Sequence, residues 1–139
     1  MSKEENKQLF EKAIQLFENK IGDEYQYILR RLKELSSDDC LDDYMYDTCE
    51  KFKLNMDSIN DYKKFIDNNY ELYSQISSAL FINDDGNVSL QKTISKNLSI
   101  YILFKGNNIV NFYINKFDGD IYEKDISIDF MINVLKKYF

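Results

Sequence analysis

The sequence predicts an α+β fold with a helical N-terminal half, an antiparallel β-meander of about four to five strands and a closing C-terminal helix. Apolar residues recur every three or four positions in the first half and every second position after about Ser77. Short turns rich in glycine and asparagine join the alternating segments, which requires antiparallel pairing of neighbouring strands. Helices and strands are thus segregated along the chain, as in α+β proteins. Because 139 residues is close to the commonest domain size, we expect residues 1–139 to form one globular domain.

Two amphipathic helical segments are predicted at the start of the chain, over residues 3–21 and 23–35. Each has one apolar stripe, and the stripes consist of Phe10, Ala13, Ile14, Phe17 and Ile21 and of Tyr25, Ile28, Leu29, Leu32 and Leu35. Gly22 stands between two stripes of nearly the same phase. Either two helices meet at Gly22, or one long helix bends there.

Two further helices are predicted before residue 77. The N-cap residue types at positions 36–39 precede a stripe formed by Leu41, Tyr44, Met45, Thr48, Cys49 and Phe52. Ser58 and Asp61 have the spacing of a capping box, which predicts the start of the next helix. The stripe of that helix consists of Ile59, Tyr62, Phe65 or Ile66, Asn69 and Tyr73.

The alternation typical of half-buried strands begins after the turn signal at residues 83–87. The residues predicted to face the core are Val88, Leu90 and Ile94, then Leu98, Ile100, Ile102 and Phe104, then Val110, Phe112 and Ile114. A turn at residues 118–120 leads to a short strand around Ile121 and Tyr122. Helical spacing returns with Met131, Val134, Leu135 and Tyr138, and we expect Asp125 or Ser127 to be the N-cap of this last helix.

The second face of the predicted meander carries large side chains as well, namely Tyr101, Leu103 and Tyr113. A sheet covered on one side only would leave them as an exposed patch. Burial by the N-terminal helices would account for them equally well. The sequence leaves both arrangements open.

The net charge of −6 is concentrated in one segment of the chain. Residues 1–35 contain seven basic and seven acidic side chains, and residues 51–139 contain eleven of each. Residues 36–50, the acidic segment, contain no base and six acids: Asp38, Asp39, Asp42, Asp43, Asp47 and Glu50. On a helix, the spacing of Asp39, Asp43, Asp47 and Glu50 would align these four carboxylates on one face.

The acidic segment has two interpretations that its sequence supports. It can be a solvated helix face that keeps the protein soluble, or a docking surface for a basic protein. For docking, the partner-binding residues would be Asp38, Asp39, Asp42, Asp43, Tyr44, Tyr46, Asp47 and Glu50, with the tyrosines supplying the aromatic area that interfaces favour. A metal site is disfavoured, because helical spacing lacks the loop geometry of calcium sites.

The composition argues against catalysis and cofactor binding. The chain contains no histidine, which is the usual general base at neutral pH and the commonest metal ligand. Phosphate-binding loops and nucleophile elbows are absent from the sequence as well. We therefore expect no cofactor, no metal and no enzymatic activity, and keep a small enzyme without a recognisable motif as an alternative.

Membrane insertion and direct nucleic-acid binding are not expected either. No run reaches the roughly 18 apolar residues of a membrane-spanning helix, and the basic residues are scattered. Cys40 and Cys49 would lie roughly 13 Å apart along a helix axis, which is too far for a disulfide. Free thiols are typical of a reducing compartment, so we expect a cytoplasmic protein.

In its profile of a small, acidic, cofactor-free α+β protein with one acidic segment, the chain resembles bacterial immunity proteins and phage-encoded inhibitors. Such proteins block basic nucleic-acid-processing enzymes by occupying their substrate groove. The resemblance implies a stoichiometric inhibitor of a basic protein, either a toxin immunity protein or a phage anti-defence inhibitor. The alternative function is that of a secretion chaperone or scaffold, which would dimerise through apolar helix or sheet surfaces. The oligomeric state separates the two.

Overall fold

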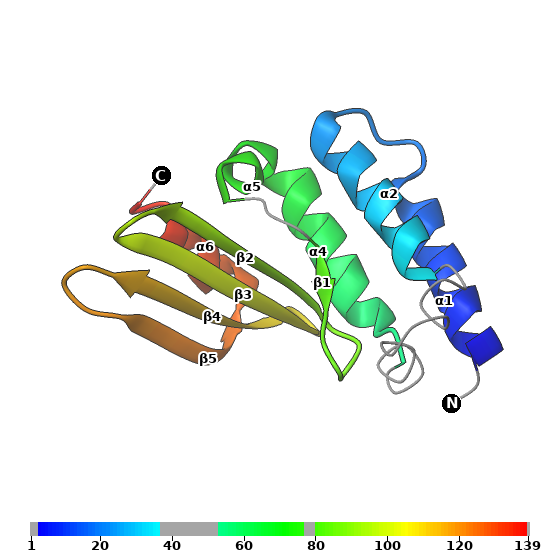
Figure 1. Cartoon of the computed structure of the whole chain (residues 1–139). Helices are drawn as coiled ribbons and strands as arrows, with labels where there is room; N and C mark the ends of the chain where they lie inside the picture. The colour runs from blue at the N-terminus through cyan, green and yellow to red at the C-terminus, as the bar shows by residue number, and fades with distance from the viewer. Residues whose placement is uncertain (1–2, 37–52, 77–79, 139) are drawn as a thin grey trace.

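The computed structural model describes residues 3–36, 53–76 and 80–138 and has an α+β architecture (Figure 1). Its helices are α1 (Lys3–Phe17), α2 (Asp23–Ser36), α4 (Met56–Asn68), α5 (Tyr70–Ile76) and α6 (Ile128–Leu135). Its strands are β1 (Phe81–Ile82), β2 (Val88–Ser95), β3 (Leu98–Gly106), β4 (Ile109–Lys116) and β5 (Ile121–Ser127). The strands form one antiparallel sheet in the order β1-β2-β3-β4-β5, so the predicted fold class, meander and closing helix are confirmed.

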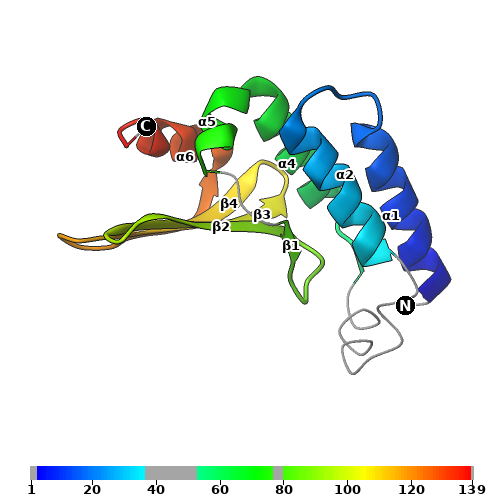
Figure 2. The same cartoon turned by 45° about the horizontal axis from the view of Figure 1, so that its top comes forward.

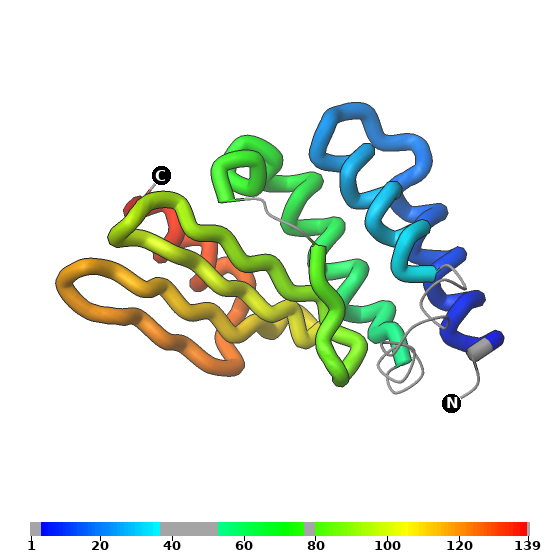
Figure 3. Tube along the Cα trace, viewed as in Figure 1, coloured from blue at the N-terminus to red at the C-terminus, as the bar shows by residue number. Residues whose placement is uncertain are grey.

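The helices next to the sheet all lie on one of its faces, as Figure 2 shows. Helix α4 contacts β2 and β3, α5 contacts β2, and α6 contacts β4 and β5. Helices α1 and α2 pair with each other and lie beyond α4 as seen from the sheet (Figure 3). Both contact the rest of the protein, α1 through α4 and α2 through Tyr25, which is hydrogen-bonded to Asp67 of α4. Within the described part of the chain, no helix covers the opposite face of the sheet (Figure 2).

The hydrophobic core lies between the sheet and α4, α5 and α6, and it continues between α4 and the pair of α1 and α2. The inward residues of β2, β3 and β4 are at most 1% exposed, and they are Val88, Leu90, Ile100, Ile102, Phe104, Val110, Phe112 and Ile114. The ring of Phe104 lies 5.5 Å from that of Tyr62 and 5.8 Å from that of Phe65, measured between centroids. Each buried side chain of this size contributes about 1.5–3 kcal/mol. The alternation in the sequence therefore predicts the core face of the sheet correctly.

Two helices, rather than one bent helix, meet at Gly22. Helix α1 ends at Phe17 and α2 begins at Asp23. Gly22 has a φ of +134°, which side chains with a Cβ rarely adopt. A Cβ at this position would also lie 2.6 Å from the hydroxyl oxygen of Tyr70. Glycine thus permits both the chain reversal and the close approach of α5.

The predicted capping box at Ser58 is wrong. The N-cap of α4 is Asn55, whose side chain accepts a hydrogen bond from the N–H of Asp57. Ser58 is fully buried instead, and its hydroxyl donates to the carbonyl of Phe104 and accepts from the N–H of Val88 at 2.8 Å. A serine that joins a helix to two strands has the same local sequence as a serine that caps a helix.

The predicted helical stripe from Ile59 to Tyr73 spans two helices. Asn69 has φ −141° and ψ 45°, outside the helical region, and separates α4 from α5. Its side-chain N–H donates to the carbonyl of Phe65 at 3.2 Å. The side chain of an asparagine can satisfy a helix-end carbonyl in this way, which favours termination of the helix here.

Strand β5 continues to Ser127, beyond the short strand predicted around Ile121 and Tyr122. The prediction stopped early because a β-bulge interrupts the alternation of the sequence. Asp125 has a φ of 56°, and its N–H donates to the side chain of Asn111 at 2.8 Å. The register shifts between Val110 and Phe112 on the partner strand. Ser127 then caps α6 by accepting from the N–H of Phe130 at 3.2 Å, so Ser127 rather than Asp125 is the N-cap.

Asp67 joins the pair of N-terminal helices to α4. Its carboxylate accepts hydrogen bonds of 2.6 Å from the hydroxyl of Tyr25 and from the ammonium of Lys63, and Lys20 lies 3.3 Å away. Partial burial would raise the pKa of Asp67, but the bonds from Lys63, Tyr25 and Lys20 hold the pKa below its usual value. The folded protein therefore stabilises the charged form of the Asp67 carboxylate relative to its protonated form.

We expect the replacement Asp67→Asn to make folding stability less sensitive to acid. A lowered folded-state pKa gives stability that is present above the unfolded pKa of about 4 and is lost as the pH falls through the lower folded pKa. The thermal midpoints of the wild type and the variant, compared at about pH 6 and about pH 3, measure this. Asp84→Asn, at an exposed position, is the control. An equal loss of stability in acid for wild type and Asp67→Asn would contradict the assignment.

None of the helices in the described ranges is both long enough and apolar enough to cross a membrane. The longest of them, α1, has 15 residues, and α2 has 14. A membrane-spanning helix needs about 20.

Candidate functional site

A row of tyrosines crosses the face of the sheet that lies opposite the helices. Tyr101 of β3 is directly opposite Tyr113 of β4, which is directly opposite Tyr122 of β5. Gln91 of β2 extends the row on the other side of Tyr101. Tyr101 and Tyr113 are half-buried and Tyr122 is 59% exposed. Of the two arrangements that the sequence leaves open, the structure has the one with an exposed patch.

The row borders a shallow hollow of about 410 Å³ on this face, the tyrosine depression. It is lined by Gln91, Thr93, Ser99, Ile100, Tyr101, Tyr113 and Tyr122. Every lining side chain is uncharged, and all except Ile100 carry a hydrogen-bonding group. The surface therefore combines aromatic area with neutral donors and acceptors.

Two neighbours, Asp120 and Tyr122, hold the ring of Tyr113 in its orientation. Its hydroxyl donates a hydrogen bond to the carboxylate of Asp120, in the turn between β4 and β5. The rings of Tyr113 and Tyr122 meet edge to face, with centroids 6.2 Å apart and an interplanar angle of 61°. On the same sheet, the ammonium of Lys105 in β3 pairs with the carboxylate of Asp125 in β5. The carboxylates of Asp120 and Asp125 are thus both engaged with neighbours.

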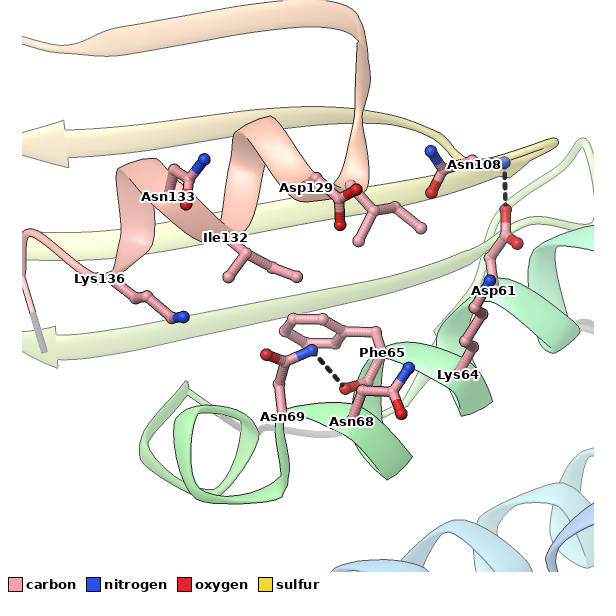
Figure 4. A pocket seen from close by; sticks show the side chains of 11 residues that line it. Asp61, Lys64, Phe65, Asn68, Asn69, Asn108, Asp129, Ile132, Asn133 and Lys136 are labelled. Atoms are coloured by element: carbon pink, nitrogen blue, oxygen red, sulfur yellow. Dashed lines mark hydrogen bonds between the residues drawn. The ribbon is translucent and has the colours of Figure 1, made fainter.

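A second hollow, of about 710 Å³, lies between α4 and α6 on the other side of the sheet (Figure 4). Its floor consists of Phe65, Ile128 and Ile132, and its rim consists of Asp61, Lys64, Asn68, Asn69, Asn108, Asp129, Asn133 and Lys136. Asp61 accepts a 2.8 Å hydrogen bond from the N–H of Asn108, which joins α4 to the turn between β3 and β4. Two lysines and two aspartates balance each other in charge, and Figure 4 shows them spread along the cleft.

Neither hollow assembles the groups of a metal centre in the described part of the chain. Across the residues with a described position, no group of three or more His, Cys, Asp or Glu side chains could hold a metal ion. Burial raises the pKa of Tyr62 and of Tyr73, whose hydroxyls are hydrogen-bonded to each other. These two tyrosines belong to the core and line neither hollow.

All eight partner-binding residues predicted from the sequence lie outside the described residues, within positions 37–52. They are Asp38, Asp39, Asp42, Asp43, Tyr44, Tyr46, Asp47 and Glu50. Cys40 and Cys49 lie there too, so the absence of a disulfide stays a prediction. On the C-terminal side of this segment, the N–H of Leu54 donates to the side chain of Asn6 at 2.9 Å and that of Asn55 to the carbonyl of Gly86 at 2.9 Å.

The charge of the described part of the chain is nearly balanced. It contains 17 of the 18 basic and 18 of the 24 acidic side chains, which gives a net charge of −1. Residues 37–52 therefore account for −5 of the total of −6. Within the described ranges, Asp67, Asp118, Asp125 and Glu34 lie within 4 Å of basic nitrogens.

Sequence reasoning singled out Tyr101 and Tyr113 but missed Gln91 and Tyr122 as their neighbours. Alternation within one strand indicates which residues share a face, whereas the row requires the register between strands. The bulge at Asp125 shifts that register within β5. Only the assembled sheet brings the four side chains together.

Comparisons with known proteins assign no family to the chain, because no family model, curated protein or solved structure matches it.

Proposed function

We propose that this chain is a non-enzymatic binding protein that acts as a stoichiometric inhibitor of a basic protein. The partner would be a nuclease toxin or another nucleic-acid-processing effector, and the chain would occupy its nucleic-acid-binding groove, as an immunity protein or a phage anti-defence inhibitor does. The observation that carries the proposal is the sheet face that none of the described helices covers (Figure 2). A row of tyrosines crosses this face.

The chemistry of this face suits contact with a protein. Tyrosine supplies a large, rigid contact area at low entropic cost, and small polar side chains supply adaptable hydrogen bonds, as in antibody paratopes. The tyrosine depression has this composition, with three tyrosines beside serine, threonine and glutamine. A catalytic site would need titratable groups that converge on one point, and the depression has only phenols.

The charge distribution supports a basic partner. Six acids without a base in residues 36–50 produce a local negative field, while the remainder of the chain is neutral. Such a field accelerates the encounter with a positively charged surface. A groove that binds nucleic acid is positively charged because it must neutralise phosphates. Carboxylates of the acidic segment would compete with those phosphates.

A dimerising chaperone or scaffold is the second candidate, because an exposed sheet face can also bind a second copy. The concentrated negative charge of residues 36–50 nevertheless favours a basic partner over a second copy, which would carry the same charge.

Affinity capture followed by reconstitution tests the proposed function. The full chain is immobilised, the captured protein is purified, and light scattering measures the mass of each component and of the complex. We expect a one-to-one complex with a basic protein whose nucleic-acid binding or cleavage is blocked. A stable homodimer at micromolar concentration, or a captured protein whose activity is unaffected, would contradict the inhibitor function.

A further inference from the structure

We propose that the tyrosine depression is a binding site for an arginine side chain of the partner protein. This inference rests on the proposed function, since it specifies which group of a basic protein the sheet face would bind. It identifies a guanidinium, rather than an apolar side chain, as the occupant.

The aromatic rings provide the first argument. Tyr101, Tyr113 and Tyr122 belong to three adjacent strands and line a single hollow of about 410 Å³. The face of an aromatic ring is negatively polarised and attracts a cation lying over it. Several rings around one hollow are the arrangement with which proteins bind organic cations. A guanidinium is flat and can also stack on a ring, which an ammonium cannot.

The polar groups between the rings provide the second argument. Thr93 on β2 and Ser99 on β3, the strand that also carries Tyr101, line the hollow, and their side-chain oxygens can accept hydrogen bonds. A guanidinium carries five N–H donors and no acceptor. It therefore requires several acceptors, and the hydroxyls of Thr93 and Ser99, together with the phenol oxygens of the row, can supply them.

The local charge provides the third argument. Among the residues that line the depression, none is basic. The carboxylate of Asp120 is bonded to the hydroxyl of Tyr113, which puts a negative charge beside one of the rings. Lys124, two residues after Tyr122, is exposed and does not line the depression. A cation entering the hollow thus meets acceptors and rings without a competing basic group in its lining.

Binding of a short peptide to the full-length chain tests the site without knowledge of the partner. The probe is the peptide acetyl-Gly-Arg-Gly-amide, titrated into ¹⁵N-labelled protein, and its lysine and citrulline forms are the comparisons. We expect saturable shifts centred on Gln91, Tyr101 and Tyr113, weaker binding of the lysine peptide, and loss of binding for citrulline, which keeps the shape but lacks the charge. Equal binding of the arginine and citrulline peptides, or shifts centred elsewhere, would overturn the proposal.

Variants assign the effect to the rings. Tyr113→Leu is expected to weaken binding of the arginine peptide about threefold to tenfold, because it removes one cation–π partner. Phe130→Leu removes a half-exposed aromatic ring on α6, on the other side of the sheet, and should leave binding unchanged. An intact ¹⁵N spectrum of each variant shows that it is folded. Equal affinity of Tyr113→Leu and the wild type would overturn the proposal.

The outcome is separable from that of the capture experiment. If a basic partner is captured and inhibited, and Tyr113→Leu binds it as tightly as the wild type does, the inhibitor function stands and the arginine site is wrong. If the arginine peptide binds as expected but no basic partner forms a complex, the site stands and the inhibitor function is wrong.

Discussion

The variant with Asp39→Asn, Asp43→Asn, Asp47→Asn and Glu50→Gln is expected to associate with the basic partner about 10- to 100-fold more slowly than the wild type at low salt. These replacements remove four of the six acids of the acidic segment. Complementary charges act mainly by steering the encounter, so the association rate should fall more than the dissociation rate rises. The salt dependence of the association rate should flatten as well, because salt screens the field that the variant no longer has.

A second variant with the same net charge separates local from overall charge. Glu4, Glu11, Glu18 and Glu71 are exposed and can be replaced by glutamine. Stopped-flow or surface-binding measurements across a series of salt concentrations compare the two variants, and thermal midpoints report whether they are folded. An unaltered association rate in the well-folded acidic-segment variant would mean that these carboxylates form only a solvated surface. Equal slowing in both variants would assign the effect to net charge.

Gly86→Ala is expected to destabilise the fold by about 3–5 kcal/mol, from backbone strain, a steric clash and a lost hydrogen bond. Gly86 lies in the turn between β1 and β2, with a φ of +79°. A Cβ there would lie 1.8 Å from the carbonyl oxygen of Lys53, which is far inside contact distance. Relieving the clash would move the turn away from Asn55, whose N–H donates to the carbonyl of Gly86 at 2.9 Å.

Gly119→Ala is the matched control for this prediction. Gly119 also has a positive φ, of +131°, but a Cβ at this position would meet no atom within 4 Å. Its replacement therefore costs backbone strain alone. Urea unfolding of both variants gives the two losses of stability, and the excess loss for Gly86→Ala reports the clash together with the lost hydrogen bond. A loss for Gly86→Ala no larger than that for Gly119→Ala would contradict the close packing of the turn against residues 53–55.

Local patterns correctly predicted the type of most described elements and their order, although they joined α4 and α5 into one helix and did not predict the short strand β1. The alternation from Leu98 to Phe104 indicates a strand because successive side chains point to opposite faces of a sheet. The stripe of Tyr25, Ile28, Leu29 and Leu32 indicates a helix because its buried residues are three or four positions apart. Both signals depend only on neighbours in the chain.

The differences between prediction and structure arise where contacts from distant residues decide. Ser58 has the spacing of a capping residue, but strands β2 and β3 supply its partners, Val88 and Phe104, which lie 30 and 46 residues away. The bulge at Asp125 depends on Asn111 of the neighbouring strand. No local pattern contains these partners, so no local pattern could predict the interactions.

The sequence by itself determined the fold class, the core face of the sheet and the concentration of charge in residues 36–50, because composition and periodicity are local properties. The tertiary structure alone decided whether helices cover the second face of the sheet as well. Both faces of β3 and β4 carry large side chains, and burial of either would contribute a similar hydrophobic free energy. The docking of α4, α5 and α6 on one face leaves Tyr101 and Tyr113 on the other, and the strand register adds Gln91 and Tyr122 to the same row.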